Sequence, residues 1–185
     1  MLTVPRGDGS FELRPLEEPD AGELYALIDR HRAHLARWLP WAQGQTPAAA
    51  VDFIGLSRRQ HAEGSALNTA IVVDGAIAGI VGVHAVNRLH LTTSIGYWLS
   101  PEHEGRGLMT RAVRAYADTA FGSWGMHRME LRAAVENARS RAVAERLGFV
   151  SEGIAREAEL VGSRRLDLVV YAVLAPEWRS ATIAE

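Results

Sequence analysis

Apolar residues recur at helical spacing along one long stretch of the chain. Between residues 109 and 121 they return at intervals of three and four, which is the pattern of a helix with one buried face. The members of this apolar stripe are Met109, Ala112, Val113, Tyr116, Ala117, Ala120 and Phe121. The spacing predicts an amphipathic helix of about three and a half turns.

Alternating and continuous apolar runs predict strands on either side of this helix. Asp74-Gly75 separates two of these runs and is a two-residue hairpin turn signal, since both central residues of such a turn need positive φ. Gly162-Ser163 separates the last two runs. The predicted strands are residues 11–16, 67–73, 77–83, 93–99, 128–135, 149–160 and 166–174.

Three further helices are predicted from their end signals. Asp20 with Glu23 three residues later resembles a capping box that opens a helix running to about His31. Thr46-Pro47 combines an N-cap residue with proline at the first helical position. Residue 137, an asparagine, predicts the start of a short helix that ends before Gly148.

The order of these elements predicts a mixed α/β fold with a mainly antiparallel sheet and helices on both sides, rather than a repeating βαβ fold. At 185 residues we expect a single domain over residues 1–185. The net charge of −2 argues against a nucleic-acid or membrane-surface partner. No stretch approaches the roughly 18 apolar residues of a membrane span. The first residues also lack the apolar run of a signal peptide, so we expect a cytoplasmic protein.

Two residue types are absent from the chain, and each absence excludes a chemistry. Without Cys there is no disulfide, no thiolate metal site and no cysteine nucleophile. Without Lys there is no Walker A loop and no Schiff-base lysine. Phosphate binding must therefore use backbone N–H groups and Arg, and a group transfer must be direct or use another nucleophile.

The strongest candidate for ligand binding is the segment that joins the strand at 93–99 to the long helix. It contains Gly105 and Gly107, which allow backbone N–H groups to turn toward a ligand without a Cβ in the way. The helix that follows offers unpaired N–H groups and a partial positive charge, which suits a pyrophosphate. A tight turn without any ligand explains the two glycines equally well when they are considered alone.

Several segments together resemble the GNAT superfamily of N-acetyltransferases, and most closely its RimJ/RimL type, which acetylates the N-termini of ribosomal proteins. Residues 102–107 fit the signature [QR]-x-x-G-x-[GA] of that superfamily except at Glu102. The resemblance covers nearly the whole chain and implies the GNAT fold with acetyl-CoA as cosubstrate. The other matching segments are residues 13–16, 38–41, 95–99, 137–140, 146–149 and 152–159.

The resemblance assigns residues to the cofactor site. The strand before the glycine loop carries a bulge in such enzymes and splays from its neighbour, and the pantetheine arm lies in the gap. A backbone N–H there polarises the acetyl carbonyl. The residues expected to bind acetyl-CoA are Tyr97, Trp98, Leu99, Glu104, Gly105, Arg106, Gly107, Leu108, Met109, Thr110 and Asn137.

The resemblance also assigns two catalytic residues. Ser140, in the run Asn137-x-x-Ser140, is expected to protonate the departing thiolate, although a serine in the first turn of a capped helix is also unremarkable. Glu159 matches the catalytic glutamate and would collect the amine's proton through water. Glu157 is the alternative base, placed by strand spacing on the same face. The seven histidines show no metal-binding spacing, so we expect no metal.

The acceptor amine is not identified by the sequence. An α-amine has a pKa of about 7.7–8.0 and a Lys side chain one of about 10.4, so a modest carboxylate base favours a protein or peptide N-terminus. The alternatives are a small amine such as an aminoglycoside, polyamine or amino acid, and a non-catalytic CoA-binding domain. RimL-type proteins are often homodimers, and the aromatic run Trp38-Leu39-Pro40-Trp41 could serve a dimer contact or the acceptor site.

Overall fold

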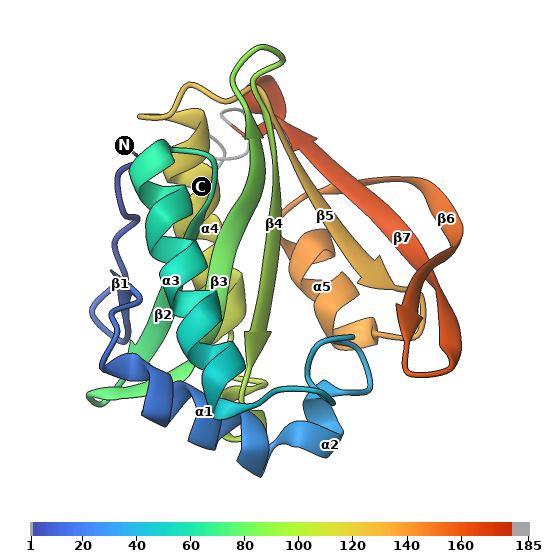
Figure 1. Cartoon of the computed structure of the whole chain (residues 1–185). Coiled ribbons are helices and arrows are strands. Elements are labelled where there is room, and N and C mark those ends of the chain that lie inside the picture. Colours follow the sequence, from blue (N-terminus) through green and yellow to red (C-terminus); the bar gives the residue numbers. More distant parts are fainter. Residues whose placement is uncertain (1, 179–185) are drawn as a thin grey trace.

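The computed structural model describes residues 2–178, which form a seven-stranded sheet with helices on both sides (Figure 1). The strands are β1 (Glu12–Pro15), β2 (Leu67–Val73), β3 (Ala76–Asn87), β4 (Thr92–Leu99), β5 (Arg128–Ala134), β6 (Val150–Val161) and β7 (Arg164–Leu174). The helices are α1 (Asp20–Arg30), α2 (Arg32–Leu35), α3 (Pro47–Glu63), α4 (Leu108–Phe121) and α5 (Ala138–Arg146), with a 3₁₀ turn at Pro101–His103. Residues 175–178 are also helical.

The sheet is mixed but mainly antiparallel. Its strands lie in the order β1-β2-β3-β4-β5-β7-β6, and β4 with β5 is the parallel pair among the described residues. This pair is connected through α4, and α5 connects β5 to β6. The expected fold class is therefore confirmed.

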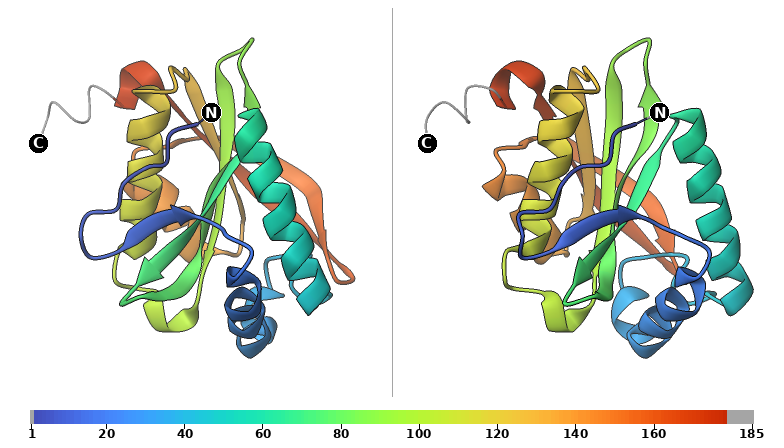
Figure 2. Two further views of the ribbon diagram at one scale, coloured as in Figure 1. Left: turned by 60° about the vertical axis from the view of Figure 1, so that its left-hand side comes forward. Right: turned by 90° about the vertical axis from the view of Figure 1, so that its left-hand side faces the viewer.

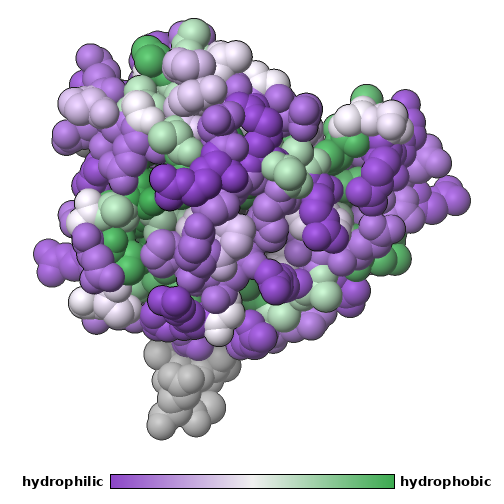
Figure 3. All heavy atoms as spheres, turned by 90° about the horizontal axis from the view of Figure 1, so that it is seen from below, coloured by the Kyte–Doolittle hydropathy of each residue, from purple (hydrophilic) through white to green (hydrophobic). Residues whose placement is uncertain are grey.

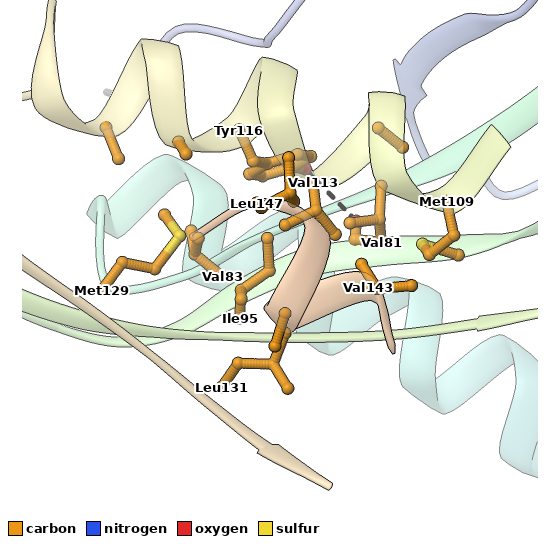
Figure 4. Close-up of a cluster of buried hydrophobic side chains, with 14 of the residues drawn as sticks. Val81, Val83, Ile95, Met109, Val113, Tyr116, Met129, Leu131, Val143 and Leu147 are labelled. Carbon is orange, nitrogen blue, oxygen red and sulfur yellow. Dashed lines mark hydrogen bonds between the residues drawn. The ribbon is translucent and has the colours of Figure 1, made fainter. Parts of the chain in front are cut away.

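The helices form two layers around the sheet, with α3 on one face and α4 on the other (Figure 2). The larger core lies between the sheet and the pair α4 and α5. Side chains from α4 and α5 meet side chains from β3, β4 and β5 there (Figure 4). A second core lies on the opposite face, where α1, α2 and α3 cover β2 and β3. Within residues 2–178, no helix covers the front of β5, β7 and β6 in Figure 1.

The predicted amphipathic helix is confirmed as α4, and its apolar stripe is buried except for the half-buried Phe121. Tyr116 is fully buried, and its hydroxyl lies 3.0 Å from Thr69 Oγ1, so this polar group is satisfied inside the core. The hairpin at Asp74-Gly75 is confirmed, with φ of 50° and 81° at its two turn residues. Thr46 caps α3 as predicted, because its Oγ1 accepts a hydrogen bond from the backbone N–H of Ala49.

The predicted capping box at Asp20 is wrong. The N-cap of α1 is Pro19, and no side chain caps this helix. The Asp20 carboxylate instead accepts two hydrogen bonds from Arg14, at 2.7 and 2.8 Å. Glu23 accepts one from the backbone N–H of Ile77. Both carboxylates hold α1 against the sheet, since the charged Arg14 of β1 and the backbone N–H of Ile77 in β3 take them in place of the local cap.

None of the helices among residues 2–178 is both long and apolar enough to cross a membrane.

Candidate active site

The two parallel strands β4 and β5 diverge halfway along their length, and this fork organises the site. They pair from Thr92 with Arg128 to Ile95 with Leu131. Beyond that point β4 and β5 no longer pair with each other, while β4 continues to pair with β3 and β5 with β7. Figure 1 shows the two strands separating downward with α5 behind them. The expected splay is therefore present.

The bulge expected in β4 lies instead in β3, its neighbour. Asn87 lies three residues after His84 in β3, whereas their partners in β4, Thr92 and Ser94, are only two residues apart. Ala85 lies within this bulge and has a φ of 51°. β4 itself stays in regular register with β3 from Ser94 to Leu99.

The glycine loop opens α4 in a form that suits an anion. Gly105 and Gly107 have φ of 74° and 70°, the left-handed region that favours glycine. No side chain caps α4, so its first N–H groups face outward from the helix end. A Cβ on Gly105 would meet nothing within 4 Å, which leaves open space beside the backbone. The loop can therefore hold a pyrophosphate by its backbone N–H groups.

The neighbouring side chains do not compete with this backbone cradle. Leu108 and Met109 are buried in the larger core, so they can offer a ligand only their backbone. Thr110 is half-buried and Arg106 is exposed. Glu104 forms an ion pair with Arg139 at the start of α5 and a hydrogen bond of 2.9 Å with His34 Nε2 of α2.

The departure from the family signature at Glu102 has a structural counterpart. Its carboxylate lies 3.0 Å from His31 Nε2, at the end of α1. Together with the pair of His34 and Glu104, this contact ties the α1–α2 segment to the glycine loop. No sequence pattern predicts either pair, because about seventy residues separate the partners.

The three predicted residues at the end of β4 alternate between the faces of the sheet. Tyr97 and Leu99 belong to the core beside α4, whereas Trp98 packs with the core under α1 and α3. The Trp98 ring lies 6.1 Å from that of Trp41, between ring centroids. Burial raises the pKa of Tyr97 to about 12, so its hydroxyl stays protonated at neutral pH.

Ser140 reaches Tyr97 across the fork. The Tyr97 hydroxyl donates to the backbone carbonyl of Ser140 at 3.1 Å and lies 3.1 Å from Ser140 Oγ. Asn137 Oδ1 accepts from the backbone N–H of Ser140 at 3.2 Å, so Asn137 caps α5 as predicted. The cap uses the backbone N–H of Ser140 and leaves its hydroxyl facing Tyr97. Ser140 can therefore belong to an ordinary capped first turn and still offer its hydroxyl as a proton donor.

Glu159 lies on β6 opposite Leu166, where it is half-buried, and burial raises the pKa of its carboxyl above the ordinary value. The regular strand spacing that predicted Glu157 on the same face as Glu159 does not hold here. The register of β6 with β7 shifts between Ala155 and Glu159, and Glu157 has a φ of 49°. Strand alternation does not extend through this irregularity.

The aromatic segment after α2, residues 38–41, lies near the ends of β4, β5, β6 and β7. Trp38 packs against an apolar cluster from β5, β6 and β7, and Trp41 packs on Trp98. This end, seen from below, has a mainly hydrophilic surface with smaller apolar patches (Figure 3). Over residues 2–178, no group of three His, Asp or Glu side chains is placed to hold a metal ion.

Comparison with known proteins gives a consistent result. The family model described as "Acetyltransferase (GNAT) domain" matches residues 10–150. A Bacillus subtilis protein named "Putative ribosomal N-acetyltransferase YdaF" is 36% identical over 168 residues, which cover 90% of this chain and 92% of the relative. The ribosomal-protein-serine acetyltransferase of Escherichia coli is 29% identical, with 88% and 92% covered. The E. coli spermidine N(1)-acetyltransferase is 28% identical, with 78% and 75% covered.

Solved structures show the same likeness. RimL, the ribosomal L7/L12 alpha-N-protein acetyltransferase in complex with coenzyme A, superposes with a TM-score of 0.88 at 25% identity, covering 93% of this chain and 98% of RimL. The microcin C7 self-immunity acetyltransferase MccE, in complex with acetyl-CoA and AMP, gives a TM-score of 0.85 at 28% identity, with 94% and 98% covered.

Proposed function

Because this chain belongs to the GNAT family of acetyltransferases, we propose that it acetylates the N-terminal α-amine of a protein. The chain is an N-acetyltransferase with acetyl-CoA as its cosubstrate, as the family match and the CoA-bound neighbours show. The identity of the acceptor, the residues that bind acetyl-CoA and the residues that catalyse transfer are our proposals.

The contact of Tyr97 with Ser140 across the fork carries the proposal for the chemistry. It places a hydroxyl group between β4 and the start of α5, at the gap where the acyl thioester would lie. The amine attacks the thioester directly, since the chain has no Cys to carry the acetyl group. Ser140 donates a proton to the departing thiolate, and Glu159 accepts the proton of the amine through water.

The proposal for the acceptor rests on the base and on the relatives. The raised pKa of Glu159 makes it a somewhat stronger base than a solvated carboxylate. It remains far below the pKa of about 10.4 of a Lys side chain, whereas an α-amine at about 7.7–8.0 is partly neutral at pH 7. Two of the relatives named above are ribosomal-protein acetyltransferases by name, and the structural neighbour RimL is an alpha-N-protein acetyltransferase.

The acceptor is tested by direct competition. We expect kcat/KM to be higher for peptides with a free N-terminus than for the same peptides N-blocked and carrying Lys, and higher than for spermidine and aminoglycosides. Release of CoA thiol measures each rate at equal acceptor concentration. A kcat/KM for any small amine about ten times that of the best peptide, a difference of about 1.4 kcal/mol, would reassign the acceptor.

The cofactor site is tested at Gly107. We propose that the backbone from Glu104 to Thr110 binds the pyrophosphate, that Tyr97, Trp98 and Leu99 line the pantetheine arm, and that Asn137 contacts the cofactor while capping α5. Gly107→Val should weaken acetyl-CoA binding about tenfold or more, because a side chain at positive φ strains the loop. Its Cβ would also lie 3.2 Å from Arg111 Nη1, which donates to the Arg106 carbonyl of the same loop. Isothermal titration calorimetry measures this affinity.

Gly125→Val is the matched control for this change. Gly125 has a similar φ of 66°, lies beyond the opposite end of α4, and a Cβ there meets nothing within 4 Å. It therefore carries the same backbone strain without touching the cradle. Equal losses of affinity in the two variants, or none in Gly107→Val, would withdraw the cofactor assignment.

We also propose that residues 1–185 act as one cytoplasmic domain and that it forms a homodimer. Exposed apolar side chains on the edge strand β6, at Val150, Ile154 and Leu160, support a contact between copies. Light scattering over a concentration series tests this, and a monomer at every concentration would remove the dimer.

A further inference from the structure

Two glycines face each other at the centre of the sheet, next to the fork. Gly82 of β3 pairs with Gly96 of β4, and Gly96 follows directly on Ile95, the last residue of β4 that pairs with β5. On the face away from α4, the side chains of neighbouring residues occupy the space that the glycines leave. A Cβ on Gly82 would lie 2.2 Å from Asn68 Oδ1, and one on Gly96 would lie 2.8 Å from His84 Cε1.

A short hydrogen-bond chain fixes the imidazole of His84 over Gly96. Asn68 Nδ2 donates to Ser57 Oγ at 3.2 Å, which directs the amide oxygen of Asn68 toward His84. His84 Nε2 lies 3.3 Å from that oxygen and must carry the hydrogen, because a carbonyl oxygen can only accept. The neutral ring therefore presents a bare Nδ1, and Nδ1 would lie 3.4 Å from a Cβ on Gly96.

His84 lines a groove on the uncovered face of the sheet. This groove, of about 520 Å³, is lined by residues of β3, β4 and β5 that include His84, Ser94, Arg128, Glu130 and Arg132. The charged groups that face it pair with one another: Arg128 with Glu130 and Glu152, and Arg132 with Glu130. Close packing of the ring also lowers the pKa of His84 by desolvation, although the residue remains exposed to the groove, so the ring is neutral at pH 7.

His84 and the proposed acid lie on opposite sides of the fork. Tyr97, which contacts Ser140, faces the core beside α4, whereas His84, Gly96 and Trp98 belong to the other face. An amine that enters from the uncovered face therefore meets His84 before it reaches the gap between β4 and β5. The departing thiolate would receive its proton from Ser140 on the opposite face, beside α4.

We propose that His84 is the residue that binds the acceptor amine, with Nδ1 accepting a hydrogen bond from the amine N–H and directing the amine's lone pair into the fork. The inference rests on the proposed function and adds the acceptor's point of entry. Glu159 keeps its role as the group that takes the proton, and no covalent step is assigned to His84.

The test measures acceptor and cofactor separately. His84→Ala should lower kcat/KM for a short peptide with a free N-terminal serine about 10-fold, the scale of one lost hydrogen bond at a group that solvent can reach. The dissociation constant of acetyl-CoA should stay unchanged, since the cradle lies elsewhere. His84→Asn should recover part of the rate, because its amide oxygen can take the place of Nδ1.

His90→Ala is the matched control, since His90 lies exposed in the turn between β3 and β4 and should behave as wild type. Each variant is also assayed with spermidine, because His84 would meet whichever amine enters. A wild-type enzyme that acetylates neither acceptor removes the proposed function and this inference with it. A wild-type enzyme that acetylates either one, with His84→Ala equally active on it, removes the role of His84 alone.

Discussion

Replacing Ser140 with alanine is expected to lower kcat roughly 10²-fold, the scale of lost general-acid catalysis, with little change in the affinity for acetyl-CoA. Ser140 Oγ lies 3.1 Å from the Tyr97 hydroxyl at the fork, while the helix cap uses only its backbone N–H. Alanine preserves that N–H and removes the hydroxyl. Steady-state kinetics with saturating acceptor, together with calorimetric titration of acetyl-CoA, separates turnover from binding.

Two further variants make this result specific. Tyr97→Phe removes the hydroxyl that orients Ser140 and should lower kcat less than Ser140→Ala does, and the double variant should be no slower than Ser140→Ala alone. Ser123→Ala, an exposed serine after α4, controls for loss of a serine hydroxyl in general. Normal turnover with a lower melting temperature in Ser140→Ala would show that the serine only stabilises the start of α5.

Local patterns predicted the elements whose signals are contained within one segment. The stripe of α4 was predictable because seven apolar positions repeat over the whole helix and all face one core. The Asp74-Gly75 turn and the Thr46 cap depend on backbone conformation within a few residues. In each case the deciding interaction is local, so the sequence contains it.

Contacts that a spacing rule does not consider account for the failures. Asp20 fits a capping box in sequence, but Arg14 and the backbone of Glu17 take its carboxylate. Glu157 fits strand spacing, but its N–H donates to Asp167 at 2.7 Å inside an irregular stretch of β6. A spacing rule assumes a regular strand, and here a bulge breaks that assumption.

The candidate site shows the same division. The glycine loop is a continuous motif, so the sequence together with the family resemblance predicts its residues. The Tyr97–Ser140 contact joins residues 43 positions apart, and the His84–Asn68 contact joins β2 to β3. Such pairs follow from strand order and register, which the pattern of apolar residues does not specify.

Glu159→Gln is expected to lower kcat/KM for the acceptor about 10²- to 10⁴-fold, the range for loss of a general base. In the wild type, Glu159 must be ionised to accept a proton, so activity should fall as the pH falls through its pKa. Burial raises that pKa, so this acidic limb should lie above the ordinary range of a glutamate. The acceptor α-amine also titrates, with a pKa of about 7.7–8.0, and its limb should remain in both enzymes. Gln cannot titrate, so only the additional fall in rate below the pKa of Glu159 should disappear from the pH–rate profile of the variant.

A stability measurement distinguishes this loss of activity from loss of the fold. Because the pKa of Glu159 is raised in the folded state, its contribution to stability is favourable at low pH and is lost as the pH rises through that pKa. At pH 7 the ionised carboxylate is therefore mildly unfavourable, and Glu159→Gln should melt no lower than wild type. Glu157→Gln is the matched control, since Glu157 is exposed on the same strand and Gln keeps its backbone bond to Asp167. The opposite result, in which Glu157→Gln loses this additional fall in rate and Glu159→Gln keeps it, would identify Glu157 as the base. The carboxylate that takes the amine's proton would then lie in the irregular stretch of β6.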